Sequence, residues 1–383
     1  MQAKPPKTIV MVAGEASGDL HGAHVIQSLR KRHDDIRVCG AGGSAMRAAG
    51  AELIVDANEL SVMGFTAIFS KAPQILKAIA KLKKLMTRLK PDLVVLIDFP
   101  DFNIHLAASA KKAGIPVLYY IGPTIWAWRP NRIIKIKQRV DHMAVILPFE
   151  ESIYRKHNVP VSFVGHPLLD NLEPPSGSQA ANPNIQVPTL ALMPGSRHDE
   201  VRRLLPTMLE AARILQRAND RTRILVSCAP SIDNALIDDI ITQHEVVNVQ
   251  TTQETAARVF AESCLSIVAS GTVSLEAAIY AMPAIIIYAV SELSYRLGKM
   301  LVKVPHIGMA NLIAGKRVLP ELVQNEATAE NIARVAGNLL ADHDAYHHMK
   351  NELKHISRLL GKPGASDRVA EIACRLMGCD CAI

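Results

Sequence analysis

The sequence predicts an α/β protein with two doubly wound domains and a helical C-terminal end. Short runs of β-branched residues alternate with amphipathic stretches, which is typical of a parallel sheet covered by helices on both faces. One segment rich in Pro, Gly and Ser interrupts this alternation near the middle of the 383-residue chain, and the alternation restarts after it. Two such domains are expected to form a cleft at the carboxyl ends of their sheets, where open α/β folds bind ligands.

The first domain is expected over residues 1–172 and should contain seven strands. Each candidate strand is a short apolar run, and the helical pattern that follows it ends in Gly or Pro, as in KAGIP at 112–116. The predicted strands are residues 8–12, 37–39, 53–56, 93–98, 117–121, 143–147 and 161–164.

Residues 173–188 are the predicted linker, because four prolines and a Ser-Gly-Ser sequence crowd into them. The second domain is expected over residues 189–350. Its predicted strands are residues 190–193, 224–228, 246–249, 265–269 and 284–288. The chain is helical from about residue 327, and the helices within 351–383 are expected to pack back on the first domain.

Composition excludes several classes of protein. Hydrophobic residues make up 49% of the chain and no long low-complexity tract interrupts them, so disordered and fibrous proteins are excluded. The longest apolar stretch, residues 277–290, is too short to cross a bilayer and contains Pro283. No secretory signal is recognised, and the six cysteines fit a reduced compartment, so we expect a cytoplasmic protein.

The positive charge is concentrated in the first half of the chain. Residues 1–168 contain 23 Lys and Arg against 13 Asp and Glu, which indicates an anionic partner for that domain. Residues 71–90 and 129–139 contain seven and five basic residues and no acidic ones. Apolar residues at helical spacing between the lysines favour an anionic membrane surface, and the alternative is a helix with a solvated face. Few aromatic residues and no RNA-binding signature argue against nucleic acid.

Two carboxylates at strand ends are the candidate catalytic residues. Glu15 lies where the first predicted strand gives way to a helix, and a carboxylate there repels phosphate and favours a role toward an acceptor or as a base. Asp98 ends a fully apolar run, so it is expected to be partly desolvated, which raises the pKa of a carboxyl group and suits general-base catalysis. The alternative is a structural helix cap, a role that Asp101 or Asn103 fits better.

Two loops of the second domain have the composition of anion sites. Ser196 and Arg197 end the first strand of that domain and open a helix, so they offer a hydroxyl, backbone N–H groups and a guanidinium. Gly271 and Thr272 repeat this arrangement after residues 265–269, and Glu276 follows within one helical turn, within reach of sugar hydroxyls. Two phosphate-type loops in one domain predict a diphosphate ligand.

Other matches are weaker. GAGGSA at 40–45 satisfies the dinucleotide fingerprint and Asp56 ends the next strand, but the match follows the second strand instead of the first. Asp19 fits the role of a cap for the helix at whose start it lies. Asp342-His343-Asp344 has the spacing of metal-dependent nucleotide-sugar sites but lies between late helices, so we expect no metal site.

Nine motifs spread over nearly the whole chain, from about residue 9 to residue 370, resemble the lipid-A-disaccharide synthase family, whose members are glycosyltransferases of the two-Rossmann (GT-B) type. The motifs are VAGEASGD (12–19), VMGF (62–65), ID with PDFN (97–103), WAWR (126–129), LPFE (147–150), VGHP (164–167), PGSR (194–197), SGTVSLE (270–276) and NLIAG (311–315).

This resemblance implies an inverting transfer of 2,3-diacylglucosamine from UDP-2,3-diacylglucosamine to 2,3-diacylglucosamine 1-phosphate. The products would be a β(1→6) disaccharide and UDP. The resemblance also implies that no metal or other cofactor is needed and that the protein works at the inner face of the inner membrane of Gram-negative bacteria, as a peripheral protein. A homodimer is left open.

The resemblance also implies roles for individual residues. Asp98 and Glu15 would lie near the acceptor, and either could take its proton. Trp128 and Arg129 would face the acceptor and the membrane. Lys77, Lys81 and Lys84 are expected to face the membrane as well, because of the charge pattern of residues 71–90. The UDP side would be lined by Ser196, Arg197, Gly271, Thr272, Glu276, Asn311 and Gln324.

Three other functions are weighed against this one. A UDP-GlcNAc 2-epimerase or another GT-B nucleotide-sugar enzyme would share the fold, because fold alone does not fix function. A nicotinamide dehydrogenase would use the 40–45 loop. A non-catalytic lipid-binding protein would bind the same lipids without releasing UDP.

Overall fold

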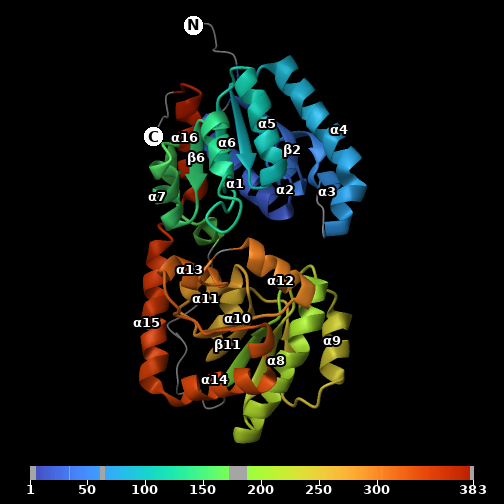
Figure 1. Cartoon of the computed structure of the whole chain (residues 1–383), viewed down its shortest axis with the longest axis vertical. Coiled ribbons are helices and arrows are strands. Elements are labelled where there is room, and N and C mark those ends of the chain that lie inside the picture. Colours follow the sequence, from blue (N-terminus) through green and yellow to red (C-terminus); the bar gives the residue numbers. More distant parts are fainter. Residues whose placement is uncertain (1–5, 34, 61–64, 172–187, 303, 380–383) are drawn as a thin grey trace. The chain divides into compact units, whose positions relative to one another are not determined.

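The computed structural model describes residues 6–33, 35–60, 65–171, 188–302 and 304–379, without the side chains of residues 58, 65–72, 171, 293, 297 and 301. The chain forms two compact units. Unit 1 contains Met1–Asn171 and Leu360–Ile383, and unit 2 contains Leu172–Leu359 (Figure 1). The predicted linker, 173–188, lies outside the described residues except for Pro188.

Unit 1 is built on a parallel sheet of seven strands in the order β3-β2-β1-β4-β5-β6-β7. All described strand pairs in it are parallel, and all seven strands predicted for this domain are present. The strands are β1 (Lys7–Ala13), β2 (Ile36–Gly42), β3 (Glu52–Asp56), β4 (Leu93–Ile97), β5 (Val117–Tyr120), β6 (His142–Val145) and β7 (Val161–Phe163).

Helices cover both faces of this sheet because its strands are apolar on both sides. Val10 and Val12 of β1 pack toward one face and Ile9 and Met11 toward the other. The helices of unit 1 are α1 (Ala16–Arg32), α2 (Ser44–Ala48), α3 (Ala57–Leu60), α4 (Phe65–Leu89), α5 (Pro100–Lys112), α6 (Arg132–Arg139), α7 (Pro148–Lys156), η1 (Pro167–Asn171) and α16 (Ala365–Leu376).

The last helix completes the core of unit 1. Buried side chains of α16, among them Val369 and Ala373, belong to the same cluster as Leu118 and Tyr120 of β5 (α16 is red in Figure 1). The carboxylate of Asp170 accepts hydrogen bonds from three backbone N–H groups at the start of α16, at 2.6–3.3 Å. The division between the units falls after Leu359, later than the predicted boundary at 350, because one continuous helix spans 343–359.

Unit 2 repeats the architecture with a parallel sheet in the order β10-β9-β8-β11-β12-β13. Its strands are β8 (Thr189–Met193), β9 (Arg223–Ser227), β10 (Val249–Thr252), β11 (Leu265–Ala269), β12 (Ala284–Tyr288) and β13 (Glu321–Val323). Its helices are α8 (His198–Ala218), α9 (Asn234–Thr242), α10 (Ala256–Ala261), α11 (Val273–Ile279), α12 (Glu292–Leu301), α13 (Met309–Ala314), η2 (Gln324–Glu326), α14 (Ala329–Ala341) and α15 (His343–Leu359). The predicted α/β class with two doubly wound domains is confirmed.

Several predicted strand bounds differ from the observed ones by one to three residues, and one observed strand was not predicted. The strand predicted at 246–249 begins only at Val249, because Asn248 has a left-handed φ of 52° that ends the preceding turn. Strand β13 was not predicted, since it is three residues long and starts with a carboxylate, Glu321. Strand β4 ends at Ile97, one residue before its predicted end at Asp98.

Candidate active site

The two candidate catalytic carboxylates follow neighbouring strands of unit 1. Ala13 at the end of β1 pairs with Ile97 at the end of β4, so the loops that carry Glu15 and Asp98 leave the sheet at the same edge. Glu15 is exposed and is the N-cap residue of α1. The Phe99 ring covers Gly14 so closely that a Cβ at Gly14 would collide with it, which explains why glycine is needed there.

The backbone at Asp98 is strained and firmly held. Asp98 and Phe99 both have a left-handed φ, 47° and 48°, a conformation that non-glycine residues adopt only when their surroundings enforce it. The carbonyl oxygen of Asp98 accepts hydrogen bonds from the Tyr119 hydroxyl and from Nδ2 of Asn103, both at 2.7 Å. Neither Asn103 nor Asp101 caps α5 as the sequence suggested; Asn103 is buried and holds this carbonyl instead.

The pKa of Asp98 is raised from its ordinary value to about 6. Burial is the main cause and the negative charge of Glu15 is the second, while a hydrogen bond from the backbone N–H of Phe99 acts in the opposite direction. The two carboxylates are therefore within electrostatic reach of each other. A group with this pKa is ionised at neutral pH and more basic than an ordinary aspartate, which suits a general base.

The two anion-type loops of unit 2 line one small pocket of about 190 Å³. Ser196, Gly271, Thr272 and Glu276 are the predicted residues that line it. The loops are tied to their surroundings by hydroxyl groups: Ser231 Oγ donates to the Ser196 carbonyl at 2.8 Å. The lining residues are Met193, Gly195, Ser196, Glu200, Ser227, Ala229, Ala269, Ser270, Gly271, Thr272, Val273 and Glu276.

Charged side chains stand in and beside this pocket. Burial raises the pKa of the Glu276 carboxyl above its ordinary range. Arg197 is the N-cap residue of α8, and its guanidinium is 71% exposed and contacts Glu200 at 3.1 Å. Arg197 does not line the pocket but is adjacent in sequence to Ser196, which does. An exposed guanidinium with one surface partner can turn toward an anionic ligand at little cost.

Asn311 and Gln324 do not line this pocket, because their amide groups are used inside unit 2. Asn311 is fully buried; its Oδ1 accepts from the backbone N–H groups of 318 and 319, and its Nδ2 donates to Glu321 at 2.7 Å. Gln324 makes a two-point contact with the backbone of Val290, at 2.6 and 3.0 Å.

Glu321, which the sequence did not suggest, connects the 307–308 loop to this network. Its buried carboxylate accepts hydrogen bonds from the backbone N–H groups of Ile307 and Gly308, both at 3.0 Å. The carbonyl of Ile307 in turn accepts from Ser270 Oγ, in the pocket wall, at 3.3 Å. Only the short strand that carries Glu321 brings it to this position, so no local pattern could have revealed it.

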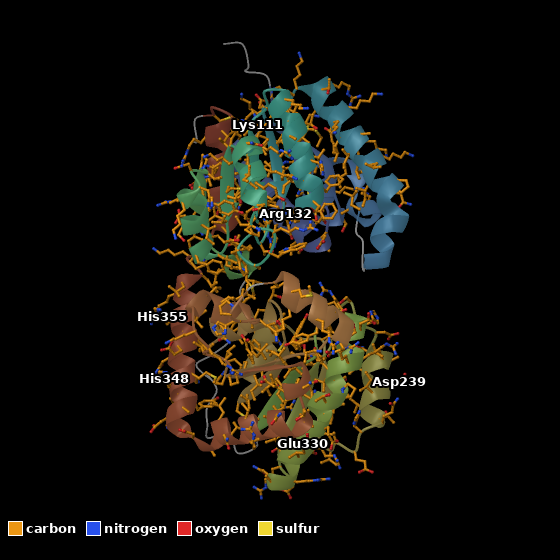
Figure 2. All side chains as sticks on the ribbon, viewed as in Figure 1. Lys111, Arg132, Asp239, Glu330, His348 and His355 are labelled. Atoms are coloured by element: carbon orange, nitrogen blue, oxygen red, sulfur yellow. The ribbon has the colours of Figure 1, made fainter. Side chains whose placement is uncertain are left out.

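The loop between β5 and α6 contains Trp128 and Arg129, the residues predicted to face the acceptor substrate. The guanidinium of Arg129 lies 4.4 Å from the centre of the Trp128 ring, and that of Arg132, at the start of α6 (Figure 2), lies 5.0 Å from it. Both arginines form ion pairs with Asp101. Arg132 was not predicted as a site residue, because its spacing fits the charged face of a helix.

A buried carboxylate also anchors this aromatic loop through a hydrogen bond from Trp126. Glu150 of α7 is 3% exposed and accepts hydrogen bonds from Nε1 of Trp126 and the backbone N–H of Leu147, both at 3.1 Å. Burial raises the pKa of Glu150 to about 7. Phe149 packs edge-on against the Trp126 ring at 5.0 Å between centres.

Helix α4 presents a basic outer face. Lys77, Lys81 and Lys84 are exposed, whereas Ile75 and Ile79 are partly buried and pack against the core of unit 1. The apolar residues of this helix therefore belong mainly to the core. The VMGF motif at 62–65 and the side chain of Phe69 lie outside the described residues and side chains.

The glycine-rich segment 40–45, which spans the end of β2 and the start of α2, binds a carboxylate of the protein itself. Asp19 is buried in α1 and accepts hydrogen bonds from the backbone N–H groups of Gly43, Ala45 and Met46, at 2.6–3.0 Å. These are the groups that a dinucleotide pyrophosphate would need. Asp19 thus caps α2 and not, as the sequence suggested, its own helix.

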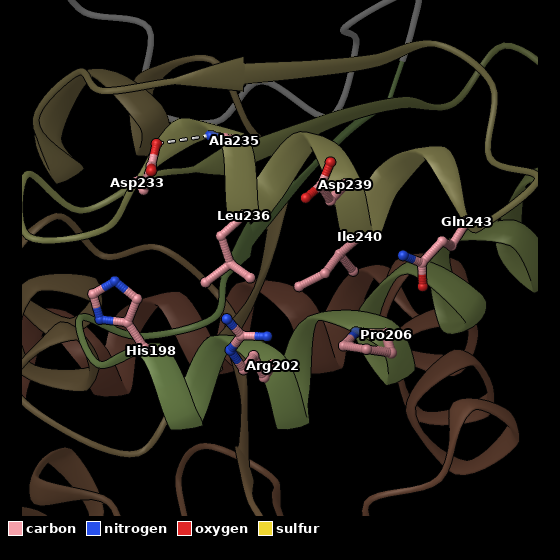
Figure 3. Close-up of a pocket in the computed structure, with 9 residues that line it drawn as sticks. All are labelled: His198, Arg202, Pro206, Asp233, Ala235, Leu236, Asp239, Ile240 and Gln243. Carbon is pink, nitrogen blue, oxygen red and sulfur yellow. Dashed lines mark hydrogen bonds between the residues drawn. The ribbon is translucent and has the colours of Figure 1, made fainter.

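A larger hollow of about 620 Å³ lies between α8 and α9 of unit 2 (Figure 3). Arg202 from α8 and Asp239 from α9 both line it, with the apolar side chains of Leu236 and Ile240 between them. Its walls carry both signs of charge and none of the predicted site residues, so it favours no particular class of ligand.

The described residues contain neither a cluster of metal-ligand side chains nor a membrane-spanning helix. No group of three or more His, Cys, Asp or Glu side chains there could hold a metal ion. No helix among them is both long and apolar enough to span a bilayer.

Comparison with known proteins identifies relatives over almost the whole chain. The family model described as lipid-A-disaccharide synthetase matches residues 9–372. A lipid-A-disaccharide synthase of Syntrophus aciditrophicus is 46% identical over 375 residues, which cover 97% of this chain and 98% of that protein. One of Geobacter metallireducens is 41% identical, with 99% of each chain covered.

Solved structures show the same fold at much lower sequence identity. A putative UDP-N-acetylglucosamine 2-epimerase from Listeria monocytogenes aligns with a TM-score of 0.63 at 14% identity, with 98% of each chain covered. MurG from Acinetobacter baumannii aligns with a TM-score of 0.62 at 15% identity, covering 96% of this chain and 99% of that one. These likenesses show the two-domain fold and leave the function to the site.

Proposed function

Because the chain belongs to the lipid-A-disaccharide synthase family, it is a glycosyltransferase, and we propose that its two units supply different parts of the reaction. The reaction joins 2,3-diacylglucosamine from its UDP donor to 2,3-diacylglucosamine 1-phosphate with inversion at the anomeric carbon. Unit 1 activates the acceptor, and unit 2 binds the UDP of the donor.

Asp98 is the proposed general base. The acceptor's 6-hydroxyl must lose a proton as its oxygen attacks the anomeric carbon opposite UDP, and a carboxylate with a pKa of about 6 can take that proton at neutral pH. The hydrogen bonds from Tyr119 and Asn103 to the Asp98 carbonyl keep the residue in place. Glu15 raises the basicity of Asp98 through its charge and remains the second candidate for the base.

The pocket of unit 2 is the proposed site of the UDP diphosphate. Backbone N–H groups at the start of α8 and near Gly271 and Thr272 favour an anion, and Arg197 can neutralise charge on the leaving diphosphate. Glu276, which lines the same pocket, is proposed to accept hydrogen bonds from the ribose hydroxyls. Asn311 and Gln324 act indirectly, because they hold the loops that flank the pocket.

The proposed membrane contact is the basic face of α4. Both substrates carry acyl chains, so unit 1 must meet them at a bilayer surface. The exposed face of the described part of α4 carries Lys77, Lys81 and Lys84 and no acidic residue. Attraction of these lysines to anionic lipids is the proposed source of binding.

The proposed mechanism rests mainly on one observation: Asp98, directly after the central strand β4, is strained in its backbone and partly desolvated. The test is incubation with UDP-2,3-diacylglucosamine and 2,3-diacylglucosamine 1-phosphate, with UDP and disaccharide measured together. We expect equal amounts of both products. Turnover of plain UDP-GlcNAc without any disaccharide would refute the proposal in favour of an epimerase, and lipid binding without UDP release would refute any transfer.

A further inference from the structure

Two arginine side chains of unit 1 share one aromatic ring and one carboxylate oxygen. The guanidinium groups of Arg129 and Arg132 both lie over the Trp128 ring. Both also donate to Oδ1 of Asp101, Arg129 at 3.3 Å and Arg132 in a closer contact. No other acidic side chain in the described part of the chain forms an ion pair with either arginine. The cluster therefore carries one net positive charge.

The members of this cluster differ in exposure. The Arg132 side chain is 8% exposed, that of Arg129 is 55% exposed and that of Asp101 is 72% exposed. Contact with the indole face and burial fix the plane of the Arg132 guanidinium. An exposed carboxylate gains little from such a pair and is easily replaced. Each guanidinium has five N–H donors, and the described contacts use few of them.

The cluster lies close to the proposed base. Asp101 is in the first turn of α5, which starts directly after Asp98 and Phe99. Burial and then the charge of Asp98 hold the pKa of Tyr119 well above its ordinary value, and the charge of Arg132 acts on the same hydroxyl in the opposite sense. Asp98 and Arg132 thus both lie within electrostatic reach of the Tyr119 hydroxyl.

We infer that Arg129 and Arg132 bind the phosphate of the acceptor and that Asp101 occupies their N–H groups until the phosphate replaces it. This inference rests on the proposed function, because it takes the acceptor to be 2,3-diacylglucosamine 1-phosphate. A phosphate monoester carries between one and two negative charges at neutral pH and three acceptor oxygens, and it matches the planar fork of arginine better than one carboxylate does. Anchoring the phosphate fixes the sugar, so that its 6-hydroxyl can be held toward Asp98.

The test compares two acceptors that differ only in this group, 2,3-diacylglucosamine with and without the 1-phosphate, both in neutral detergent micelles. The wild-type protein should prefer the phosphorylated acceptor in kcat/KM. Arg129→Ala should reduce this preference about tenfold or more, mainly through the KM of the phosphorylated acceptor. Arg129 is half exposed, so its replacement is expected to leave the fold intact. Arg132→Lys, which keeps the charge and loses the fork, should also reduce the preference.

Arg155→Ala is the matched control, since Arg155 is an exposed arginine of the same unit paired with Glu151 at 2.8 Å; it should leave the preference unchanged. Asp101→Asn should lower the KM of the phosphorylated acceptor, because no carboxylate then competes. A higher KM in that variant would overturn the exchange of carboxylate for phosphate.

Equal preferences in wild type and Arg129→Ala would overturn the inference. If Arg129→Ala instead weakened sedimentation with anionic vesicles free of acceptor and left the preference unchanged, the arginines would bind lipid headgroups and the inference would be wrong. No disaccharide from either acceptor with the wild-type protein would refute the proposed function itself, and this inference with it.

Discussion

The substitution Asp98→Asn keeps the shape of the side chain and removes its ability to accept a proton. In the wild-type protein, a pKa of about 6 leaves about ten ionised Asp98 carboxylates for each protonated one at pH 7. Loss of a general base lowers kcat by roughly 10²–10⁴-fold. We expect a fall of this size with the affinity for UDP unchanged, measured by UDP release at saturating substrates.

The pH dependence gives the same prediction a second, independent readout. The ionised form of Asp98 is the active one, so kcat/KM of the wild type should fall tenfold per pH unit below about pH 6 and be level above it. Glu15→Gln removes the negative charge that helps to raise the pKa of Asp98, so the fall should begin at a lower pH. Since burial is the larger cause, the shift should be partial.

Glu52→Gln is the control for the Asp98→Asn and Glu15→Gln variants, because Glu52 is an exposed carboxylate of unit 1 that forms an ion pair with Arg37 at 2.6 Å. It should change neither kcat nor the pH profile. Near-normal turnover of Asp98→Asn would refute the assignment of the base. If Glu15→Gln alone then abolished turnover, Glu15 would be the base.

Three further predictions concern the network behind the pocket, the aromatic loop and helix α4. Glu321→Gln should destabilise the fold by about 2 kcal/mol in urea unfolding, because the amide nitrogen cannot accept hydrogen bonds from the backbone N–H groups of Ile307 and Gly308. The control Glu326→Gln, at an exposed position, should leave the stability unchanged. Equal stability of the two variants would contradict the role of Glu321. The raised pKa of Glu150 means that the folded state holds the proton of this carboxyl more tightly than the unfolded state does. As the pH rises from about 4.5 to above 7, the wild type should therefore lose on the order of 3 kcal/mol of stability relative to Glu150→Gln in urea unfolding. A stability difference between the two proteins that stays constant from pH 5 to pH 8 would contradict this. Changing three α4 lysines to Gln should weaken the affinity for anionic vesicles, measured by sedimentation, about 100-fold at low salt, because each charge contributes about 1 kcal/mol. At high salt the change should have little effect. An equal loss of affinity in the charge-matched control would place the membrane contact elsewhere. The α4 variant replaces Lys77, Lys81 and Lys84, and the control replaces Lys31, Lys112 and Lys156, which are exposed elsewhere on unit 1.

Most of the fold could be predicted because the central strands of both sheets bury both of their faces. A run such as 93–97 is apolar at every position, and in the structure it lies at 0% exposure between two layers of helices. The same reasoning missed β13, whose three residues include a buried carboxylate that is stable only through bonds to residues 307, 308 and 311. Tertiary contacts, and not the local pattern, make that segment a strand.

The candidate pocket of unit 2 could be predicted because the turns that line it directly follow strands. Ser196 and Gly271 are far apart in sequence, but both follow parallel strands of one sheet, so the topology alone brings them to one pocket. Side chains that act through other residues could not be found in this way. Nothing in the sequence distinguishes Asn311, whose amide is consumed inside unit 2, from an asparagine that faces a ligand.

Several departures from local backbone rules lie at the ends of strands, near the candidate site residues. Left-handed backbone at non-glycine residues is expected at helix ends, as at Lys90 and Asn158. It also occurs directly after parallel strands, at Asp98 after β4, Ile121 after β5 and Gln324 after β13. Isoleucine and glutamine rarely adopt this conformation, and aspartate does so more often but still as a minority. Surrounding hydrogen bonds therefore hold it, as those from Tyr119 and Asn103 do at Asp98. The sequence predicts which strand ends carry candidate residues, but the strained backbone that fixes the direction of a side chain such as Asp98 arises only when the sheet is assembled.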